Sequence, residues 1–221
     1  MTKPSWLDQR YERTFFDSQT LFYDDVIRLR GKEWLNDSII NYYLLYLENV
    51  KYEQQKDDLL FLSPSVTFWI MQVKEKEDVA DAINPLNPTQ KDLIFIPIND
   101  NSDETGEVSG GSHWSLVVYN RKEDTFNYYD SSGDYNYGSA VKTVAKIAHF
   151  LNPKYDYGTM SIKINKISCS QQQNGYDCGV YLLSFCDVLG NAEHVKNVSP
   201  RDINCLREDI LKKIQQGVGA T

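Results

Sequence analysis

The sequence reads Gln171-Gln172-Gln173-Asn174-Gly175-Tyr176-Asp177-Cys178-Gly179 immediately before an apolar run from Val180 to Leu189. The apolar run predicts a buried helix that begins close to the cysteine. A thiolate at a helix N-terminus faces unpaired backbone N–H groups and the positive end of the helix dipole, and both stabilise it. The neighbours support this layout, because Gly175 and Gly179 allow close approach of the backbone and Asp177 can cap the helix. The segment therefore predicts a nucleophilic cysteine at the start of a core helix.

The other cysteines lack these surroundings. A cysteine before an apolar run is, by itself, more often a buried core thiol than a nucleophile. Cys186 lies within the apolar run and is predicted to be core, whereas Cys169 lies in a polar turn and Cys205 in a later helical segment. The glycines and amide side chains before Cys178 therefore single it out among the four cysteines.

A histidine and a carboxylate lie in two further segments, Gly110-Gly111-Ser112-His113-Trp114-Ser115 and Tyr128-Tyr129-Asp130-Ser131. Residues 114–119 and 125–130 are predicted strands, and residues 121–124 form the hairpin turn between them. In an antiparallel hairpin the start of the first strand lies beside the end of the second, so His113 and Asp130 are expected at the same sheet edge. Cysteine, histidine and acid are the three parts of a thiol-protease triad.

The remaining pattern predicts an α+β fold. Residues 21–29 resemble short extended or turn segments, and the polar loop 99–111 is long enough to suggest a functional loop. The resulting order predicts a mostly antiparallel mixed sheet flanked by helices, in a single domain over residues 1–221. Helices are expected over 37–47 (capped by Asn36 or Asp37), 64–73 (capped by Ser63), 141–151, 178–189 and 200–214 (capped by Ser199), and strands over 93–98, 114–119, 125–130 and 159–167.

The composition argues against two classes of partner. A net charge of −8 and a pI near 4.9 disfavour a nucleic-acid backbone as ligand. The charge suits either a partner with a basic face or simply good solubility. No apolar run reaches the roughly 18 residues needed to cross a bilayer, and the first residues lack a signal-peptide core, so no membrane partner is expected. We expect a monomeric, cytosolic or nuclear protein whose cysteines are reduced.

The sequence contains no motif of a metal site, a phosphate-binding loop or a serine hydrolase. No C-x-x-C or H-x-x-x-H pair indicates a metal site. No G-x-x-x-x-G-K-[ST] or G-x-S-x-G motif indicates a phosphate-binding loop or a serine hydrolase. Neither a metal nor a cofactor is therefore expected.

The motifs His113-Trp114, Tyr129-Asp130-Ser131 and Gln172 to Gly179 occur in the chain order His, Asp, Cys, with a glutamine six residues before the cysteine (178 − 172). Together they resemble the Ulp/sentrin-specific cysteine protease family over residues 34–189. Trp34-Leu35-Asn36-Asp37, the segment from Ile98 to Ser102 and the short chain resemble the small single-domain deneddylases of that family. The resemblance implies a papain-like Ulp protease architecture.

The resemblance also implies a role for each residue of the site. Cys178 would be the nucleophile, His113 would protonate the leaving amine, and Asp130 would orient the His113 ring. Gln172 would donate its side-chain amide to the oxyanion, with the Cys178 backbone N–H as the second donor.

A second group of residues would hold the substrate tail. Trp114 and Trp34 would form the walls of a narrow tunnel that accepts Gly-Gly, because a backbone without side chains fits between flat indoles. Asp37, with Asp100 as a second candidate, would hold a basic residue upstream of that Gly-Gly, and Asn99 would contact the tail. The 99–111 loop is expected to become ordered when the modifier binds.

The activity implied is hydrolysis of the bond after the C-terminal Gly-Gly of a ubiquitin-like modifier. The neddylation modifier is favoured, both in precursors and on lysines such as those of cullins, and SUMO is the runner-up. Two rival hypotheses are an acyltransferase with the same His-Asp-Cys order and a non-catalytic modifier-binding module. The contexts of Trp114 and Gln172 argue against the acyltransferase, and the complete triad argues against the binding module.

Overall fold

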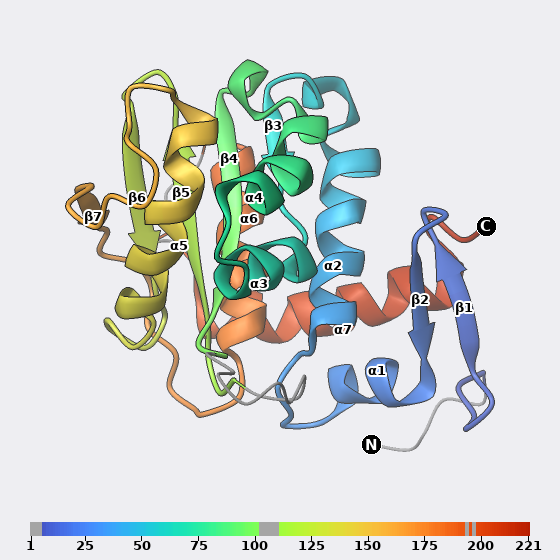
Figure 1. The fold of residues 1–221 in the computed structure, drawn as a ribbon. Helices are drawn as coiled ribbons and strands as arrows, with labels where there is room; N and C mark the ends of the chain where they lie inside the picture. Colours follow the sequence, from blue (N-terminus) through green and yellow to red (C-terminus); the bar gives the residue numbers. More distant parts are fainter. Residues whose placement is uncertain (1–5, 102–110, 193–194, 196–197) are drawn as a thin grey trace.

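Successive side chains of the strand that follows His113 belong in turn to two buried hydrophobic clusters. Leu116 and Val118 belong to one cluster, whereas Val117 and Tyr119 belong to the other. Successive side chains of a strand point to opposite faces of its sheet, so the sheet must be covered on both sides. In the computed structural model, which describes residues 6–101, 111–192, 195 and 198–221, the two clusters lie on either side of a five-stranded sheet (Figure 1).

The sheet is mixed, with strand order β3-β4-β5-β6-β7. The central strand β5 is antiparallel to both β4 and β6, and the two short edge strands run parallel to their neighbours. The strands are β3 (Leu59–Phe61), β4 (Leu93–Asn99), β5 (Trp114–Asn120), β6 (Thr125–Tyr129) and β7 (Ile164–Lys166).

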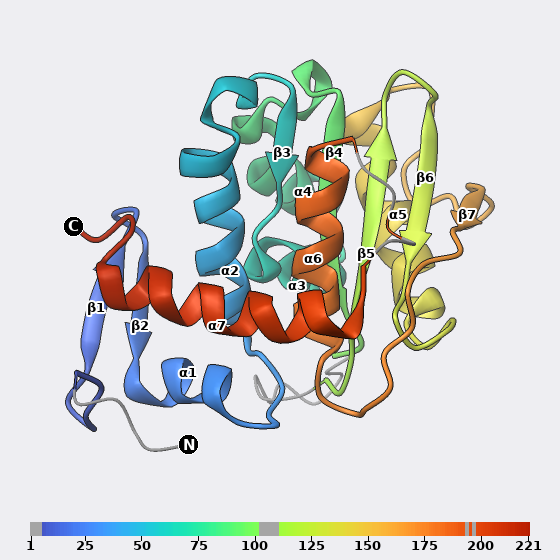
Figure 2. The ribbon, with the colours of Figure 1, turned by 180° about the vertical axis from the view of Figure 1, so that it is seen from behind.

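Helices cover both faces of the sheet. The face of Leu116 and Val118 is covered by α6 (Cys178–Gly190), which packs on β5 and lies against α2 (Asp37–Tyr46) and α7 (Pro200–Gln216) (Figure 2). The opposite face is covered by α3 (Pro64–Gln72), α4 (Lys76–Ile83) and α5 (Tyr137–Leu151). The α+β prediction, with helices on both sides of a mixed sheet, is confirmed.

A small hairpin precedes these layers. It consists of β1 (Glu12–Phe15) and β2 (Gln19–Phe22), is followed by α1 (Tyr23–Ile27), and lies beside α2 and the end of α7 (Figures 1 and 2). The shorter helical turns are Arg28–Arg30, Leu47–Lys51, Glu53–Gln55, Asn84–Leu86 and Pro88–Gln90. Within the described residues, none of the helices combines the length and the apolar character that a membrane crossing requires.

Three helices start at the capping residues that the sequence indicated. The side chain of Asn36 accepts a hydrogen bond from the Ile39 N–H at 3.3 Å and caps α2. Ser63 caps α3, and Ser199 caps α7. These oxygens satisfy backbone N–H groups that a helix leaves without an internal partner.

Three local predictions differ from the structure. Residues 26–29 are helical rather than an extended or turn segment, because the Asp25 carboxylate accepts the Phe22 N–H at 2.8 Å at the start of α1. The strand expected over 159–167 is limited to Ile164–Lys166, which pairs with Phe126 to Tyr128 of β6. Helix α5 begins at Tyr137, one turn earlier than its apolar spacing indicates.

Lys146 joins two helices that cover the same face of the sheet. Its Nζ donates to the carbonyl oxygens of Ile70, Met71 and Val73, at 3.0, 2.7 and 2.6 Å, at the C-terminus of α3. A cation at this end of a helix also interacts favourably with the helix dipole.

We predict that Lys146→Met lowers the free energy of unfolding by about 1–3 kcal/mol, because three carbonyls lose a charged donor. Urea denaturation measures the change. Lys142→Met is the matched control, since Lys142 is exposed on the same helix. The control should change stability by less than about 0.5 kcal/mol. Equal losses in the two variants would show that the contacts with α3 contribute nothing.

Candidate active site

His113 and Asp130 meet at one edge of the sheet. His113 directly precedes β5, Asp130 directly follows β6, and His113 Nε2 lies 2.6 Å from Asp130 Oδ1. The Tyr128 hydroxyl donates to Asp130 Oδ2 at 2.5 Å, and the Ser132 N–H donates to Oδ1 at 2.8 Å. Both carboxylate oxygens are thus held from several directions, which fixes the orientation of the His113 ring.

The two groups hold opposite charges. Burial opposes protonation of His113, but hydrogen bonds to Asp130 and Cys178, with the charges of both, raise the pKa of His113 to about 9. Burial alone would raise the pKa of Asp130. Hydrogen bonds from His113, Tyr128 and the Ser132 N–H instead lower this pKa below its usual value. At neutral pH the ring is therefore an imidazolium beside a carboxylate.

The backbone of His113 is held on both sides. The Asp100 carboxylate accepts the N–H groups of Ser112 and His113 at 2.6 and 2.9 Å. The side-chain amides of Asn136 and Asn99 donate to the His113 carbonyl at 2.9 and 3.3 Å. Asp100, which the sequence suggested for the substrate tail, is therefore placed against the segment that carries His113.

Cys178 is the first residue of α6, and its side chain is 1% exposed. Cys178 and His113 line the same cavity, and the interaction with Cys178 contributes to the raised pKa of His113. The Cys178 N–H is among those that a helix leaves without an internal acceptor. The structure thus places the predicted nucleophile at a helix N-terminus and beside the imidazolium.

Asp177 is the N-cap residue of α6, as predicted, but its side chain makes no capping hydrogen bond to the helix. Its carboxylate turns away from α6 and accepts from Asn174 Nδ2 at 2.7 Å and from Arg207 Nε at 2.8 Å. Instead, Asn174 Oδ1 accepts the N–H groups of Tyr176 and Asp177 at 3.1 and 3.0 Å. The turn before the helix is therefore held by the Asn174 side chain, while the Asp177 carboxylate forms an ion pair with Arg207 of α7.

The two glycines around Cys178 differ in their surroundings. A Cβ at Gly179 would lie 3.1 Å from Leu35 Cβ and 3.4 Å from Trp114 Cδ1, so the helix start packs closely against both residues. A Cβ at Gly175 would meet nothing within 4 Å. The predicted close approach holds for Gly179 and not for Gly175.

Two glutamines join the cysteine segment to the segment that follows β6. Gln172 Oε1 accepts from Ser131 Oγ at 2.7 Å, and Gln172 Nε2 donates to the Asn174 carbonyl at 2.6 Å. Gln171 Nε2 donates to the Asp130 carbonyl at 2.9 Å. The side chain of Gln172 is thereby fixed next to the start of α6, with one Nε2 hydrogen left for another acceptor.

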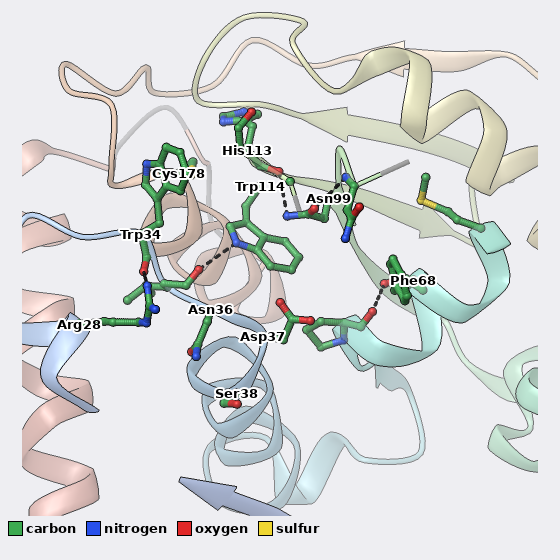
Figure 3. A pocket seen from close by; sticks show the side chains of 17 residues that line it. Arg28, Trp34, Asn36, Asp37, Ser38, Phe68, Asn99, His113, Trp114 and Cys178 are labelled. Carbon is green, nitrogen blue, oxygen red and sulfur yellow. Dashed lines mark hydrogen bonds between the residues drawn. The ribbon is translucent and has the colours of Figure 1, made fainter. Parts of the chain in front are cut away.

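A cavity of about 470 Å³ opens beside the thiol (Figure 3). Trp114 is 6% exposed and donates its Nε1–H to the Leu35 carbonyl at 3.0 Å, whereas Trp34 is 47% exposed and donates to the Gly175 carbonyl. Burial raises the pKa of Asp37, which lies at the first turn of α2. Among the predicted site residues, those that line the cavity are Trp34, Asp37, Asn99, His113, Trp114 and Cys178.

Three supporting residues are not evident from the sequence as parts of the site. Ser131 belongs to a motif but has no role that the motif itself indicates, and Asn136 lies in a polar turn with no evident signal. The position of Arg207 could have been recognised from the sequence, because it lies at helical spacing from Ile203 and Ile210 on the buried face of α7. A charged residue on such a face needs a buried partner.

The described ranges contain no candidate metal centre. No group of three or more His, Cys, Asp or Glu side chains in them has the arrangement of a metal site. The carboxylates of Asp130, Asp177 and Asp100 are instead paired with His113, Arg207 and a backbone N–H group.

Comparison with known proteins assigns the family. Residues 33–219 match the model of the Ulp1 protease family, C-terminal catalytic domain. The chain belongs to the Ulp1 protease family. It is therefore a cysteine peptidase, as the combined histidine, aspartate and cysteine motifs predicted.

Several members of the Ulp1 protease family resemble the chain over most of its length. "NEDD8-specific protease 1" from Arabidopsis thaliana is 35% identical over 90% of this chain and 94% of its own. The human "Sentrin-specific protease 8" is 34% identical over 75% of this chain and 74% of its own. The solved C-terminal Ulp1 protease domain in complex with Smt3, the yeast ortholog of SUMO, shares the fold with a TM-score of 0.74 and 21% identity, covering 95% and 89% of the two chains.

We predict that the alkaline limb of the pH–activity profile reports His113. Activity should fall as the pH rises through about 9, because the imidazolium then loses its proton. Asp130→Asn removes the charge that favours the imidazolium, so this limb should move to lower pH, and kcat should fall by about 10²–10⁴. Initial rates across the pH range measure both effects.

Asp134→Asn is the matched control, because Asp134 is exposed and forms a surface ion pair with Lys166. It should leave the profile unchanged. An alkaline limb that stays near pH 9 in Asp130→Asn would contradict the assignment to His113.

Proposed function

We propose that the protein hydrolyses the bond after the C-terminal Gly-Gly of NEDD8, both in its precursor and in its conjugates with lysine side chains. The observation that carries the proposal is the meeting of Cys178, His113 and Asp130 at a cavity lined by Trp34 and Trp114. The similarity to a relative named NEDD8-specific protease 1, at 35% identity over nearly the whole of both chains, supports the choice of modifier.

The reaction would proceed in two steps. The Cys178 thiolate attacks the carbonyl carbon of the last glycine, and the His113 imidazolium gives its proton to the departing amine. Water then attacks the resulting thioester while His113 accepts one of its protons. Cleavage of the C–S bond releases the modifier as its carboxylic acid, which ionises, and regenerates the Cys178 thiolate beside the His113 imidazolium. Asp130 holds the His113 ring through Nε2 during both steps, which leaves Nδ1 for the exchange of protons.

Two donors would stabilise the oxyanion of each step. The first is the N–H of Cys178 at the first residue of α6, where the helix dipole adds to its effect. The second is Gln172 Nε2, which has a hydrogen beyond the one given to the Asn174 carbonyl. Ser131 supports this assignment, since its hydroxyl holds the opposite end of the Gln172 amide.

The walls of the cavity would favour glycine in the substrate tail. Trp114 is held by Leu35 and lies against Gly179, and Trp34 is held by the Gly175 carbonyl, so both indoles are anchored to segments beside Cys178. A backbone without side chains would pass between them. Asp37 would pair with a basic residue upstream of Gly-Gly, because its carboxylate lines the cavity and is accessible to an incoming cation. Conjugates of cullins are the cellular substrates that the family resemblance suggests.

SUMO is the second candidate modifier. The solved Ulp1 domain that shares this fold was determined with Smt3, but an identity of 21% carries no information on specificity here. Competition between electrophile-tipped NEDD8 and SUMO probes separates the two candidates. We expect preferential capture of the NEDD8 probe, with the label on Cys178, and the Cys178→Ala variant should remain unlabelled. Preferential capture of the SUMO probe would reverse the choice of modifier.

We predict that Gln172→Ala lowers kcat by about 10²–10³ with little change in KM, because one oxyanion donor is lost. Steady-state hydrolysis of a fluorogenic modifier ester or amide measures both constants. Gln173→Ala is the control, since Gln173 is an exposed neighbour in the same segment. Equal effects of the two substitutions would remove Gln172 from the oxyanion site.

A further inference from the structure

A buried arginine of α7 connects the two segments that border the cavity. Arg207 is 6% exposed, and its ion-pair partner Asp177 is 5% exposed. Arg207 Nε and Nη2 lie 2.8 and 2.7 Å from Asp177 Oδ1. Asp177 directly precedes Cys178, so the guanidinium is attached to the segment that carries the nucleophile.

The same guanidinium also holds the segment that carries Trp34. Nη1 donates to the Arg28 carbonyl at 3.1 Å, and Nη2 donates to the Glu33 carbonyl at 2.8 Å. A third carbonyl, that of Tyr176, accepts from Nη2 at 3.1 Å. One side chain thus fixes the residue before Trp34 and the two residues before Cys178 in a single arrangement.

This arrangement needs an arginine in particular. A planar guanidinium presents its donors in a fixed fork, whereas a lysine ammonium is a point charge on a flexible stem. A buried ion pair is also weak evidence for stability, because desolvation offsets most of the attraction. The apolar face of α7 already packs through Ile203, Ile210 and Ile214. The pair is therefore better explained by the geometry it imposes than by the stability it adds.

The charge of Arg207 matters to the thiolate. Asp177 is adjacent to Cys178, and an uncompensated carboxylate there would oppose a second negative charge on sulfur. Arg207 compensates that carboxylate inside the protein, where screening by water is weak. The other charged groups nearby are His113 beside the thiol, Asp37 in the cavity, Arg28 with Glu33 at 4.0 Å, and Arg30, Lys32, Lys212 and Glu208 along the groove beside Asp177.

We propose that Arg207 is a positioning residue of the protease site, which fixes the Trp34 segment against the Cys178 segment and compensates Asp177 so that the thiolate forms. The inference rests on the proposed function in taking Cys178 as the nucleophile. It assigns two separable contributions to one side chain. The fork of Arg207 sets the geometry of the cavity, and its charge sets the reactivity of the sulfur.

The charge contribution is tested by alkylation with iodoacetamide, with the rate on the Cys178 peptide followed by mass spectrometry across pH. Cys205→Ser is the background, because Cys205 is an exposed thiol on the same helix. In Arg207→Met the rate near pH 6 should fall by about tenfold, since the Asp177 carboxylate opposes the thiolate. Adding Asp177→Asn should restore the rate, because the opposing charge is then absent.

The geometric contribution is tested with Arg207→Lys, which keeps the charge and loses the fork. We expect its alkylation profile to match that of the unmutated protein, while kcat/KM on the modifier falls by about 10²-fold because the cavity walls are misplaced. Arg201→Met is the matched control, as Arg201 is exposed on the same helix and should leave both measurements unchanged.

Thermal unfolding identifies the variants that retain the fold. If Arg207→Met alone does not fold, the test rests on Arg207→Lys and on the double variant that lacks both charges. The proposal would be overturned by an unchanged kcat/KM in Arg207→Lys. It would also be overturned if folded Arg207→Met had the same alkylation profile as the unmutated protein. The alkylation experiment contains no modifier. Failure to cleave NEDD8 would therefore count against the proposed function, while the alkylation rates would still test the effect of Arg207 on the Cys178 thiol.

Discussion

The hydrogen bond between His113 Nε2 and Asp130 Oδ1, at 2.6 Å, joins the start of β5 to the end of β6, and the rest of the site is arranged around it. It forms because the two strands are antiparallel neighbours in the middle of the sheet, where both faces are covered by helices. The Tyr128 hydroxyl and the N–H groups of Ser132 and Asn136 also donate to the carboxylate. A buried imidazolium is tolerated because its partner carboxylate is itself fully hydrogen-bonded.

The second half of the site depends on contacts between segments that are distant in sequence. Cys178 is placed by the N-terminus of α6, and that helix is held against Leu35 and Trp114 through the missing side chain of Gly179. Glutamine and serine side chains connect the cysteine segment to the segment after β6. Arg207 connects it to the Trp34 segment. The cavity therefore depends on the relative placement of α2, α6, α7 and the inner strands.

The sequence predicted what local pattern and strand pairing determine. The core helix after Cys178, the caps at Asn36, Ser63 and Ser199, and the hairpin that brings His113 to Asp130 follow from apolar spacing and capping chemistry. It could not predict partners set by tertiary packing. The Asp177 carboxylate looked like a side-chain helix cap because its neighbours in sequence allow that, but Arg207, 30 residues further on, provides a charged donor that a backbone N–H does not outcompete. Asp100 likewise resembles a substrate ligand in the sequence, but in the structure its carboxylate accepts the Ser112 N–H. Part of the 99–111 loop, over residues 102–110, lies outside the described residues.

We propose that sulfur, imidazole, carboxylate and two indoles form one site for a Gly-Gly tail. A crystal structure of the protein joined covalently to NEDD8 with an electrophile at its C-terminal glycine tests this most directly. We expect a thioether at Cys178 Sγ, with the two glycines between Trp34 and Trp114 and an upstream basic side chain beside Asp37. Attachment at another cysteine, or a tail that lies outside the cavity bordered by the two indoles, would contradict it.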